Sequence, residues 1–204
     1  MTIMTKLLSN TPNTPYYINE HAVVDENVII GENSKIWHFS HVQKGAKIGK
    51  HCVLGQNVNI GNNVIIGDYC KIQNNVSIYE GVTLEDYVFC GPSMVFTNIL
   101  DPKCKYPQVG AEFYVKTLVK EGASIGANAT IVCGNTLGKH CLIGAGTVVT
   151  KDVPDYALVV GVPGKIIGWV SEAGKKLVFD KDGIALCEKS KKKYKLEIYK
   201  VSEV

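Results

Sequence analysis

The chain has 204 residues, of which 46% are hydrophobic and 20% are charged, and its formal net charge is +3. A chain of this length is expected to form one domain with small appendages. All 22 basic residues are lysine. Many of them lie in residues 175–204, where they indicate a solvated tail. The composition therefore argues against a nucleic-acid-binding groove.

The N-terminus and the cysteines bear on the cellular compartment. Met1–Asn10 contains a single lysine and a pair of leucines, which is too little for a signal peptide or a membrane span. The seven cysteines include no Cys-x-x-Cys pair, and core filling accounts for several of them. We therefore predict a cytoplasmic protein with reduced cysteines and no membrane span.

An apolar residue recurs at every sixth position of the chain in two series that differ in phase. The first series is Ile18, Val24, Ile30, Ile36, Val42, Ile48, Leu54, Ile60, Ile66, Ile72, Ile78, Leu84, Cys90 and Phe96. The second is Val119, Ile125, Ile131, Leu137, Ile143 and Val149. Short units that hide an apolar face only by stacking on the next unit produce such a period, so it predicts a solenoid. A β-sandwich would not keep a fixed spacing of six.

Each hexad carries the pattern of a short strand followed by a corner. The position two residues before the periodic residue is small or valine, as at Ser34 and Val58, so both positions face the interior of a strand. Glycine often follows the periodic residue, as at Gly49, and marks a corner that needs an unusual dihedral angle or a close approach. The hexads resemble those of the left-handed parallel β-helix, in which three hexads form one triangular coil of 18 residues. We therefore predict an all-β fold of this class.

Departures from the repeat define the expected domain boundaries. Residues 1–17 read as an irregular lead-in, and residues 18–170 form the β-helix. Residues 97–118 interrupt it as a long loop that contains two prolines. Irregular loops of this length in compact domains are usually functional or disordered.

Residues 171–204 are expected to form a C-terminal tail with a small β-appendix. The turn signal Asp182-Gly183 precedes two apolar stretches, Ile184–Cys187 and Tyr194–Tyr199. Together they predict a β-hairpin.

One column of the β-helix is expected to be polar but uncharged. Residues 18 apart should lie one above another, about 4.8 Å apart. The segments after Ile36, Leu54, Ile72 and Cys90 read WHFSH, GQNVN, QNNVS and GPSMV, without lysine, aspartate or glutamate. Depletion of charge is typical of an oligomer interface, and amides suit a sugar-binding groove. The alternative is an amide ladder that only stabilises the stacking.

Several segments carry a more specific resemblance. They are Ile36–Val42 (IWHFSHV), Lys71–Asn98 (with QNNVS and FCGPSMVFTN), Ile125–Gly134 and Ile143–Val170. Over Tyr16–Val170 the chain resembles nucleotide-amino-sugar N-acetyltransferases, and most of all the branch that acts on UDP-2-acetamido-3-amino-2,3-dideoxyglucuronate. Enzymes that act on dTDP-3-amino-3,6-dideoxyhexoses are the alternative within this family.

The resemblance implies an activity and an assembly. The reaction would move an acetyl group from acetyl-CoA, as co-substrate, to the 3-amino group of a nucleotide-linked sugar, for surface polysaccharide or glycan biosynthesis. The protein would be a homotrimer with its sites between subunits.

The resemblance also implies roles for individual residues. The catalytic candidates are Asn98 and His38. Asn98 is expected at the end of the polar column, where Asn75 and Ser93 point, and would orient the substrate. His38 would act as a base unless the CoA sulfur takes the proton. The substrate-binding candidates are His41, Gln56, Asn57, Asn74, Asn75 and Lys103. The candidates for acetyl-CoA are Gly126, Ala127, Gly144, Ala145, Lys151, Pro163 and Lys165. No carboxylate is paired with a histidine at an informative spacing.

Two of these candidates differ from the family. Lys165 and Lys103 stand where its members usually carry arginine. Lysine keeps the charge but loses the bidentate fork. Because the chain has no arginine anywhere, we interpret both changes as compositional bias.

Two other functional classes are compatible with the repeat. γ-Type carbonic anhydrases bind Zn²⁺ through histidines of neighbouring subunits, but Gln56 and Asn59 stack on His38 and His41, so we predict no metal. A non-enzymatic scaffold trimer is the other class, and it gives no reason for the long loop. Metal analysis and CoA-affinity binding distinguish these classes from an acetyltransferase.

Overall fold

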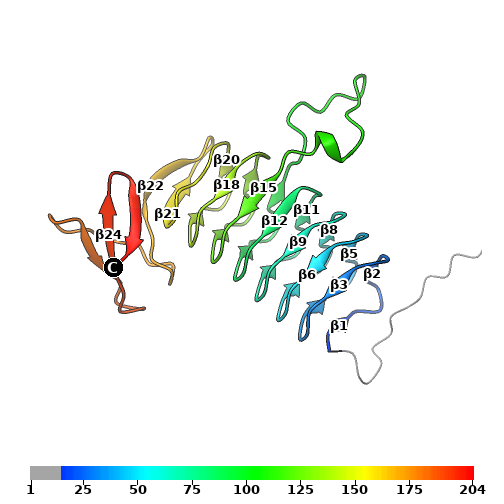
Figure 1. Cartoon of the computed structure of the whole chain (residues 1–204), viewed down its shortest axis with the longest axis horizontal. Coiled ribbons are helices and arrows are strands. Elements are labelled where there is room, and N and C mark those ends of the chain that lie inside the picture. The colour runs from blue at the N-terminus through cyan, green and yellow to red at the C-terminus, as the bar shows by residue number, and fades with distance from the viewer. Residues whose placement is uncertain (1–14) are drawn as a thin grey trace, which may run out of the picture.

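The protein is a solenoid of short parallel strands in the computed structural model, which describes residues 15–204 (Figure 1). Successive strands go to three different sheets, so that each strand pairs with the third one after it. Lys35 pairs with Val53, and Val53 pairs with Lys71, which corresponds to a coil of 18 residues. The predicted all-β hexapeptide-repeat β-helix is therefore confirmed.

Three sheets form the sides of the solenoid. Sheet A has the order β1 (Tyr17–Ile18), β4 (Lys35–Ile36), β7 (Val53–Leu54), β10 (Lys71–Ile72), β13 (Phe89–Cys90), β16 (Ser124–Ile125), β19 (Leu142–Ile143), β21 (Ala157–Val160) and β22 (Lys165–Trp169). Sheet B has the order β2 (Val23–Val24), β5 (His41–Val42), β8 (Asn59–Ile60), β11 (Ser77–Ile78), β14 (Val95–Phe96), β17 (Thr130–Ile131) and β20 (Val148–Val149). Sheet C has the order β3 (Ile29–Ile30), β6 (Lys47–Ile48), β9 (Ile65–Ile66), β12 (Val82–Leu84), β15 (Thr117–Val119) and β18 (Thr136–Leu137).

Tight corners join the sheets, and each kind of corner forms a file along the solenoid. We call the file between sheets A and B the A–B corner; its turns are residues 37–39, 55–57, 73–75, 91–93, 126–128 and 144–146. The B–C corner follows sheet B, and the C–A corner follows sheet C. The predicted polar column coincides with the A–B corner and the outer face of sheet B.

The hexad glycines serve close approach between coils rather than an unusual dihedral angle. A Cβ atom at Gly49 would lie 2.5 Å from the carbonyl oxygen of Gly67 in the next coil. The left-handed conformation falls two residues later in each corner, at residues such as His51 (φ 55°) and Asn57 (φ 57°). Asparagine tolerates this conformation better than most residues, which explains its frequency at the corners.

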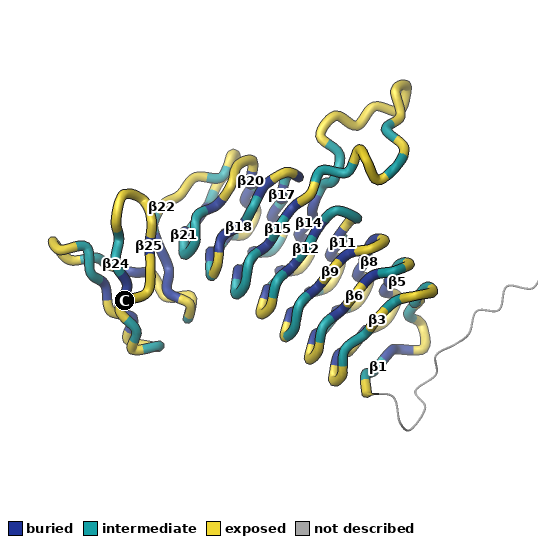
Figure 2. The backbone as a smooth tube through the Cα atoms, viewed as in Figure 1, coloured by how far each residue is buried: buried dark blue, intermediate teal, exposed yellow. Residues whose placement is uncertain are grey.

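The inward positions of the hexads form one continuous core. The periodic residues from Ile36 to Phe96 are buried, and so are the small residues two positions earlier (Figure 2). The buried hydroxyl group of Ser40 donates to the carbonyl oxygen of Gly55 at 2.8 Å and accepts the backbone N–H of Val58 at 3.2 Å. A polar group of this kind costs little when both its donor and its acceptor are used.

The inserted loop projects from the B–C corner between β14 and β15 (Figure 1). It contains a short 3₁₀ helix, Ala111–Phe113, and most of its residues are exposed. The predicted boundary of 97–118 lies two residues too late, because Thr117 and Leu118 pair with Val82 and Thr83 of β12. The loop therefore returns to the repeat inside a strand whose periodic residue is Val119.

A second β-unit follows the solenoid at its C-terminal end. Strand β22 pairs antiparallel with β21 and covers the last edge of sheet A. The tail then forms a three-stranded antiparallel sheet of β23 (Ile184–Leu186), β24 (Lys193–Glu197) and β25 (Lys200–Glu203). The fully buried Tyr194 packs this sheet against the solenoid. Its ring contacts that of Tyr156 edge-on, with 5.4 Å between the ring centroids.

The prediction of a single strand over Tyr194–Tyr199 is wrong at its end. Ile198 and Tyr199 have positive φ values of 39° and 59° and form the turn between β24 and β25. The alternation of apolar residues runs on into this turn, so the pattern alone gave no sign of the strand end.

The part of the chain in residues 15–204 holds no helix that is long and apolar enough to cross a membrane. The expectation about Met1–Asn10 falls on residues outside that range, and the cytoplasmic location stays a prediction.

Most cysteines should be unreactive in the folded protein. Burial raises the pKa of the Cys90 and Cys141 thiols to about 12, and Cys52 and Cys70 are also fully buried. Cys104 is exposed in the loop. Because only the thiolate reacts, we expect a maleimide at pH 7.5 to modify Cys104 within minutes and these four only after unfolding. Mass spectrometry of labelled peptides measures this, and rapid native labelling of Cys90 would contradict the buried assignment.

Candidate active site

An open pocket of about 320 Å³ lies on the A–B corner. It is lined by Trp37, His38, Val53, Gly55, Gln56, Ile72, Gln73 and Asn74. The structure thus brings together three of the residues predicted from the sequence, His38, Gln56 and Asn74. Trp37 and Gln73, which the sequence analysis did not propose as site residues, belong to the same pocket.

Part of the polar column is indeed a ladder that supports the stacking. The Asn74 side-chain oxygen accepts the backbone N–H of Gln56 at 2.9 Å, just as Asp68 accepts that of Lys50 at 2.7 Å on the C–A corner. The Asn57 amide donates to the Asn75 side-chain oxygen at 3.0 Å. The side chains of Asn57, Asn74 and Asn75 therefore have a structural role, whatever else they bind.

The two histidines of the column have different partners. The Nε2 atom of His38 lies 3.2 Å from the amide nitrogen of the buried Asn19. The Nε2 atom of His41 lies 3.0 Å from a carboxylate oxygen of Asp25, on the outer face of sheet B. A carboxylate is therefore paired with a histidine, although no sequence spacing pointed to such a pair. Asp25 follows β2, the strand that pairs with β5, so the stacking of coils supplies a neighbour that sequence spacing did not suggest.

Asn98 lies on a different corner from the amides. It follows β14 in sheet B, and its side-chain amide donates to the carbonyl oxygen of Glu80 at 3.3 Å on the B–C corner. The sequence analysis placed Asn98 at the end of the polar column, beside Asn75 and Ser93. That placement is wrong because residues 94–96 carry the chain across sheet B before Asn98.

His38 and Asn98 are also separated along the axis of the solenoid. His38 follows β4, whereas Asn98 belongs to the coil of β13 and β14, three strand spacings further on. At about 4.8 Å per spacing the two residues stand roughly 14 Å apart along the axis. One chain therefore does not bring both side chains to one reacting carbon.

Four of the acetyl-CoA candidates, Gly126, Ala127, Gly144 and Ala145, stack in a file near the C-terminal end of the A–B corner. The backbone N–H of Gly126 donates to the Ile143 carbonyl oxygen, and a Cβ atom at Gly126 would lie 2.5 Å from the backbone nitrogen of Ala145. Ala127 is half-buried and Ala145 is exposed. At Gly126, Ala127, Gly144 and Ala145 the two coils therefore form a smooth strip without side chains beyond a methyl group, and Asn128 borders it.

The remaining predicted residues lie in two places. Lys151 lines a small cavity with Gly164 and Ile166, so it stands beside the β21–β22 turn that carries Pro163 and Lys165. Lys103 is exposed in the inserted loop. The cofactor candidates thus gather toward the last coils, whereas Lys103 stands apart from them on the loop.

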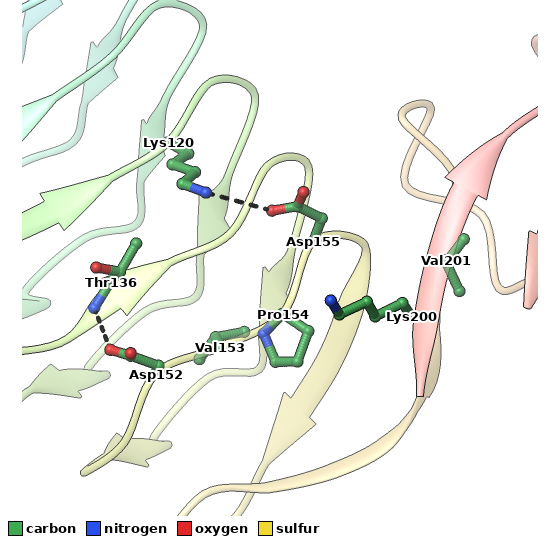
Figure 3. A pocket seen from close by; sticks show the side chains of 8 residues that line it. All are labelled: Lys120, Thr136, Asp152, Val153, Pro154, Asp155, Lys200 and Val201. Carbon is green, nitrogen blue, oxygen red and sulfur yellow. Dashed lines mark hydrogen bonds and ion pairs between the residues drawn. The ribbon is translucent and has the colours of Figure 1, made fainter. Parts of the chain in front are cut away.

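A larger cavity of about 440 Å³ lies between the last coils and the C-terminal sheet (Figure 3). Asp152 accepts the backbone N–H of Thr136 at 2.7 Å, and Asp155 accepts that of Lys139 at 2.8 Å. Between them Val153 pairs with Leu137 at the edge of sheet C, and the two carboxylates bind backbone N–H groups on either side of that bridge. Lys120 lies 4.0 Å from Asp155 (Figure 3). No residue predicted for the site lines this cavity, and its acids act as caps.

Residues 15–204 contain no cluster of three or more histidine, cysteine, aspartate or glutamate side chains arranged to hold a metal ion. His38 and His41 bind separate partners, as described above.

Sequence comparison identifies the repeat. A model of the bacterial transferase hexapeptide (six repeats) matches residues 27–62, and a model of the hexapeptide repeat of succinyl-transferase matches residues 45–80 and 121–151. Residues 27–80 and 121–151 therefore consist of hexapeptide repeats. The matches include regular coils on both sides of the loop.

Two curated relatives match part of the chain. The dTDP-3-amino-3,6-dideoxy-alpha-D-galactopyranose 3-N-acetyltransferase of Aneurinibacillus thermoaerophilus is 49% identical over 79 residues, which are 38% of this chain and 41% of that protein. The serine acetyltransferase of Bacillus subtilis is 33% identical over 113 residues, 55% of this chain and 41% of that protein. The chain thus spans about two fifths of the length of these relatives. The expected similarity to a nucleotide-amino-sugar N-acetyltransferase is therefore found over 79 residues of the chain.

A solved structure supports the fold. A mutant of GDP-perosamine N-acetyl transferase from Caulobacter crescentus, in complex with CoA and GDP-perosamine, matches with a TM-score of 0.51 and 24% identity. The match covers 74% of this chain and 55% of that chain. At this identity the likeness concerns the fold alone.

Proposed function

We propose that this chain transfers the acetyl group of acetyl-CoA to the 3-amino group of a nucleotide-linked amino sugar. The observation that carries the proposal is the 49% identity to a dTDP-sugar 3-N-acetyltransferase. The FCGPSMVFTN and QNNVS segments favour UDP-2-acetamido-3-amino-2,3-dideoxyglucuronate as the substrate. The name of the relative favours the dTDP-3-amino-3,6-dideoxyhexoses as the competing substrate class.

The order of the candidate residues along the axis supports the proposal. The pocket on the A–B corner is centred on Gly55, after β7, and Asn98 stands two coils further on. The smooth strip of Gly126 and Ala145 occupies the next two coils, and Lys151 and Lys165 follow at the end. A nucleotide sugar and acetyl-CoA laid end to end along the A–B corner would therefore meet at the axial level of Asn98, which itself lies across sheet B on the B–C corner, with the CoA phosphates beside the lysines.

The chemistry needs no base from the chain. The neutral amine attacks the thioester carbonyl carbon, and a tetrahedral oxyanion forms. The C–S bond then breaks, and the departing CoA sulfur takes the proton of the ammonium group, which gives the amide and the free thiol. The chain holds the two substrates in line and offers amide dipoles to the oxyanion, as in other preorganised acyl-transfer sites.

A panel of amino-sugar nucleotides tests the proposal. UDP-linked and dTDP-linked 3-amino sugars, with and without a carboxylate on the sugar, are incubated with acetyl-CoA while thiol release is followed. We expect turnover with a 3-amino sugar and none with the 4-amino isomer. Absence of thiol release with every member of the panel would refute the acetyltransferase proposal.

We also propose a homotrimer with the sites between subunits. Phe39 is exposed on the uncharged A–B corner, and the inserted loop carries further exposed apolar residues, Leu100, Val109 and Phe113. Apolar surface of this kind is usually covered by a partner, and closed cyclic symmetry covers it without leaving a free end. Light scattering at micromolar concentration should give three times the chain mass. A stable monomer would contradict the assembly.

If the pantetheine arm of acetyl-CoA lies along the strip of Gly126 and Ala145, bulky side chains there should obstruct it. We expect Ala145→Leu to raise the KM for acetyl-CoA about tenfold or more, because the loss of one good apolar contact and the added clash exceed about 1.4 kcal/mol. The KM for the nucleotide sugar is the internal control and should change little. Steady-state kinetics with each substrate varied in turn measures both, and an unchanged KM for acetyl-CoA in Ala145→Leu and Ala127→Leu would place the arm elsewhere.

A further inference from the structure

We propose that the pocket on the A–B corner binds the pyrimidine base of the nucleotide sugar, stacked on Trp37. The inference rests on the proposed function and names the part of the substrate that this corner holds. The competing occupant is a second copy of the chain that covers Trp37.

The pocket has the shape of a slot for a flat ring. Gly55 forms its floor, because it has no side chain between Trp37 in the preceding coil and Gln73 in the following one. The two walls stand two strand spacings apart, about 10 Å between their backbones. A planar base stacked at van der Waals distance from a ring on one side and an amide on the other fits between them.

The Trp37 wall is flat and held in place. Its indole lies nearly parallel to the His38 imidazole, with an angle of 11° and 6.1 Å between the ring centroids. Tyr17 packs on Trp37 from the preceding coil at 5.4 Å. Even so, 38% of the Trp37 surface stays exposed, so the indole is open to a ligand.

The polar groups of the pocket match the edge of a uracil or thymine. Such a base presents an N–H donor flanked by two carbonyl acceptors, and a carboxamide offers one donor and one acceptor side by side. The Asn74 oxygen is committed to the Gln56 backbone. In the described part of the chain the side-chain amides of Gln56 and Gln73 have no hydrogen-bond partner, so both are available to the base.

The lysines beside the slot fit the phosphates of the nucleotide. Lys35 and Lys71 are exposed and pair in register on either side of Val53, which lines the pocket. Their ammonium groups create a positive field that favours a phosphate-bearing ligand. Asn98 stands two coils, about 10 Å along the axis, beyond the slot and on the B–C corner, so the ribose and the diphosphate must cross the outer face of sheet B to bring the amino sugar to it.

Calorimetric titration of the full chain with UDP tests the slot, and inorganic pyrophosphate is the probe without a base. We expect Trp37→Ala to weaken UDP binding about tenfold or more, in the range usual for the loss of one stacked base. Trp37→Phe should retain most of the affinity, and pyrophosphate binding should be unaffected by either change. Tyr87→Ala removes another exposed ring, on the C–A corner, and should bind UDP as tightly as the parent does.

The two proposals fail in different ways. If Trp37→Ala is folded by circular dichroism and binds UDP as tightly as the parent, the slot assignment is wrong, whatever the activity. The assignment is equally overturned if UDP does not bind and Trp37→Ala instead dissociates the oligomer, because the occupant is then a second copy. If no amino-sugar nucleotide is acetylated but UDP binding depends on Trp37, the slot stands and the proposed reaction fails.

Discussion

Replacing Asn98 by alanine should lower kcat about a hundredfold while the protein stays folded. A preorganised amide that binds a sugar hydroxyl or the thioester carbonyl contributes on the order of 3 kcal/mol to the transition state, and 1.4 kcal/mol corresponds to a factor of ten. The only bond lost from the described structure is the long one to the Glu80 carbonyl, at 3.3 Å. Stability should therefore change far less than turnover, which steady-state kinetics and thermal unfolding measure together.

His38→Ala is the matched comparison for Asn98→Ala. His38 stands three coils from Asn98, so its loss should affect the binding of the nucleotide sugar more than kcat. The pH dependence of kcat distinguishes proton removal by His38 from proton transfer to the CoA sulfur, because an imidazole base would give a limb near pH 6.5. If His38→Ala abolishes turnover and removes that limb while Asn98→Ala is nearly silent, the imidazole is the base and our assignment is wrong.

Ile72→Ala should destabilise the solenoid by about 2–5 kcal/mol, which for a chain of this size lowers the Tm by roughly 10 °C. Ile72 is fully buried in the middle of sheet A, and the coils on either side hold its neighbours in place. The cavity left by its side chain therefore does not collapse easily. Differential scanning calorimetry measures the shift.

Ile65→Ala is the control for this core substitution. Ile65 stands in β9 of the same part of the solenoid, but 47% of it is exposed. The same atoms are removed, yet little burial is lost, so the Tm should shift by only a small fraction of that in Ile72→Ala. Equal shifts in the two variants would mean that the inward and outward faces have been assigned incorrectly.

The six-residue period was sufficient for the architecture because it is a local property of the sequence. Each unit repeats the same choice of inward residues, so one rule assigns the faces of every coil, and residues such as Ile72 and Cys70 are buried as that rule predicts. The pattern failed at the edges of the repeat. Ile198 and Tyr199 continue an apolar alternation through a turn, and Thr117 begins a strand before the periodic residue Val119.

The site was predictable only in part. Gln56 and Asn74 meet in the pocket because residues 18 apart stack, which the repeat already implies. The repeat does not say which hydrogen-bonding groups remain free. The structure shows that Asn74 is used by the Gln56 backbone, whereas Gln73 and Trp37 border the open slot over Gly55.

The sequence by itself therefore determined the solenoid, its inward residues and the uncharged column, since all three follow from a spacing that any coil repeats. Only the tertiary structure decided which side chains meet when they are not 18 residues apart, and which hydrogen-bonding groups stay free. Asp25 contacts His41 because its coil stacks on the coil that carries β5. Asn98 lies on the B–C corner, away from the amides, because the chain crosses sheet B before it reaches Asn98. Contacts of this kind depend on the sheet or corner that carries a residue as well as on its position within the hexad.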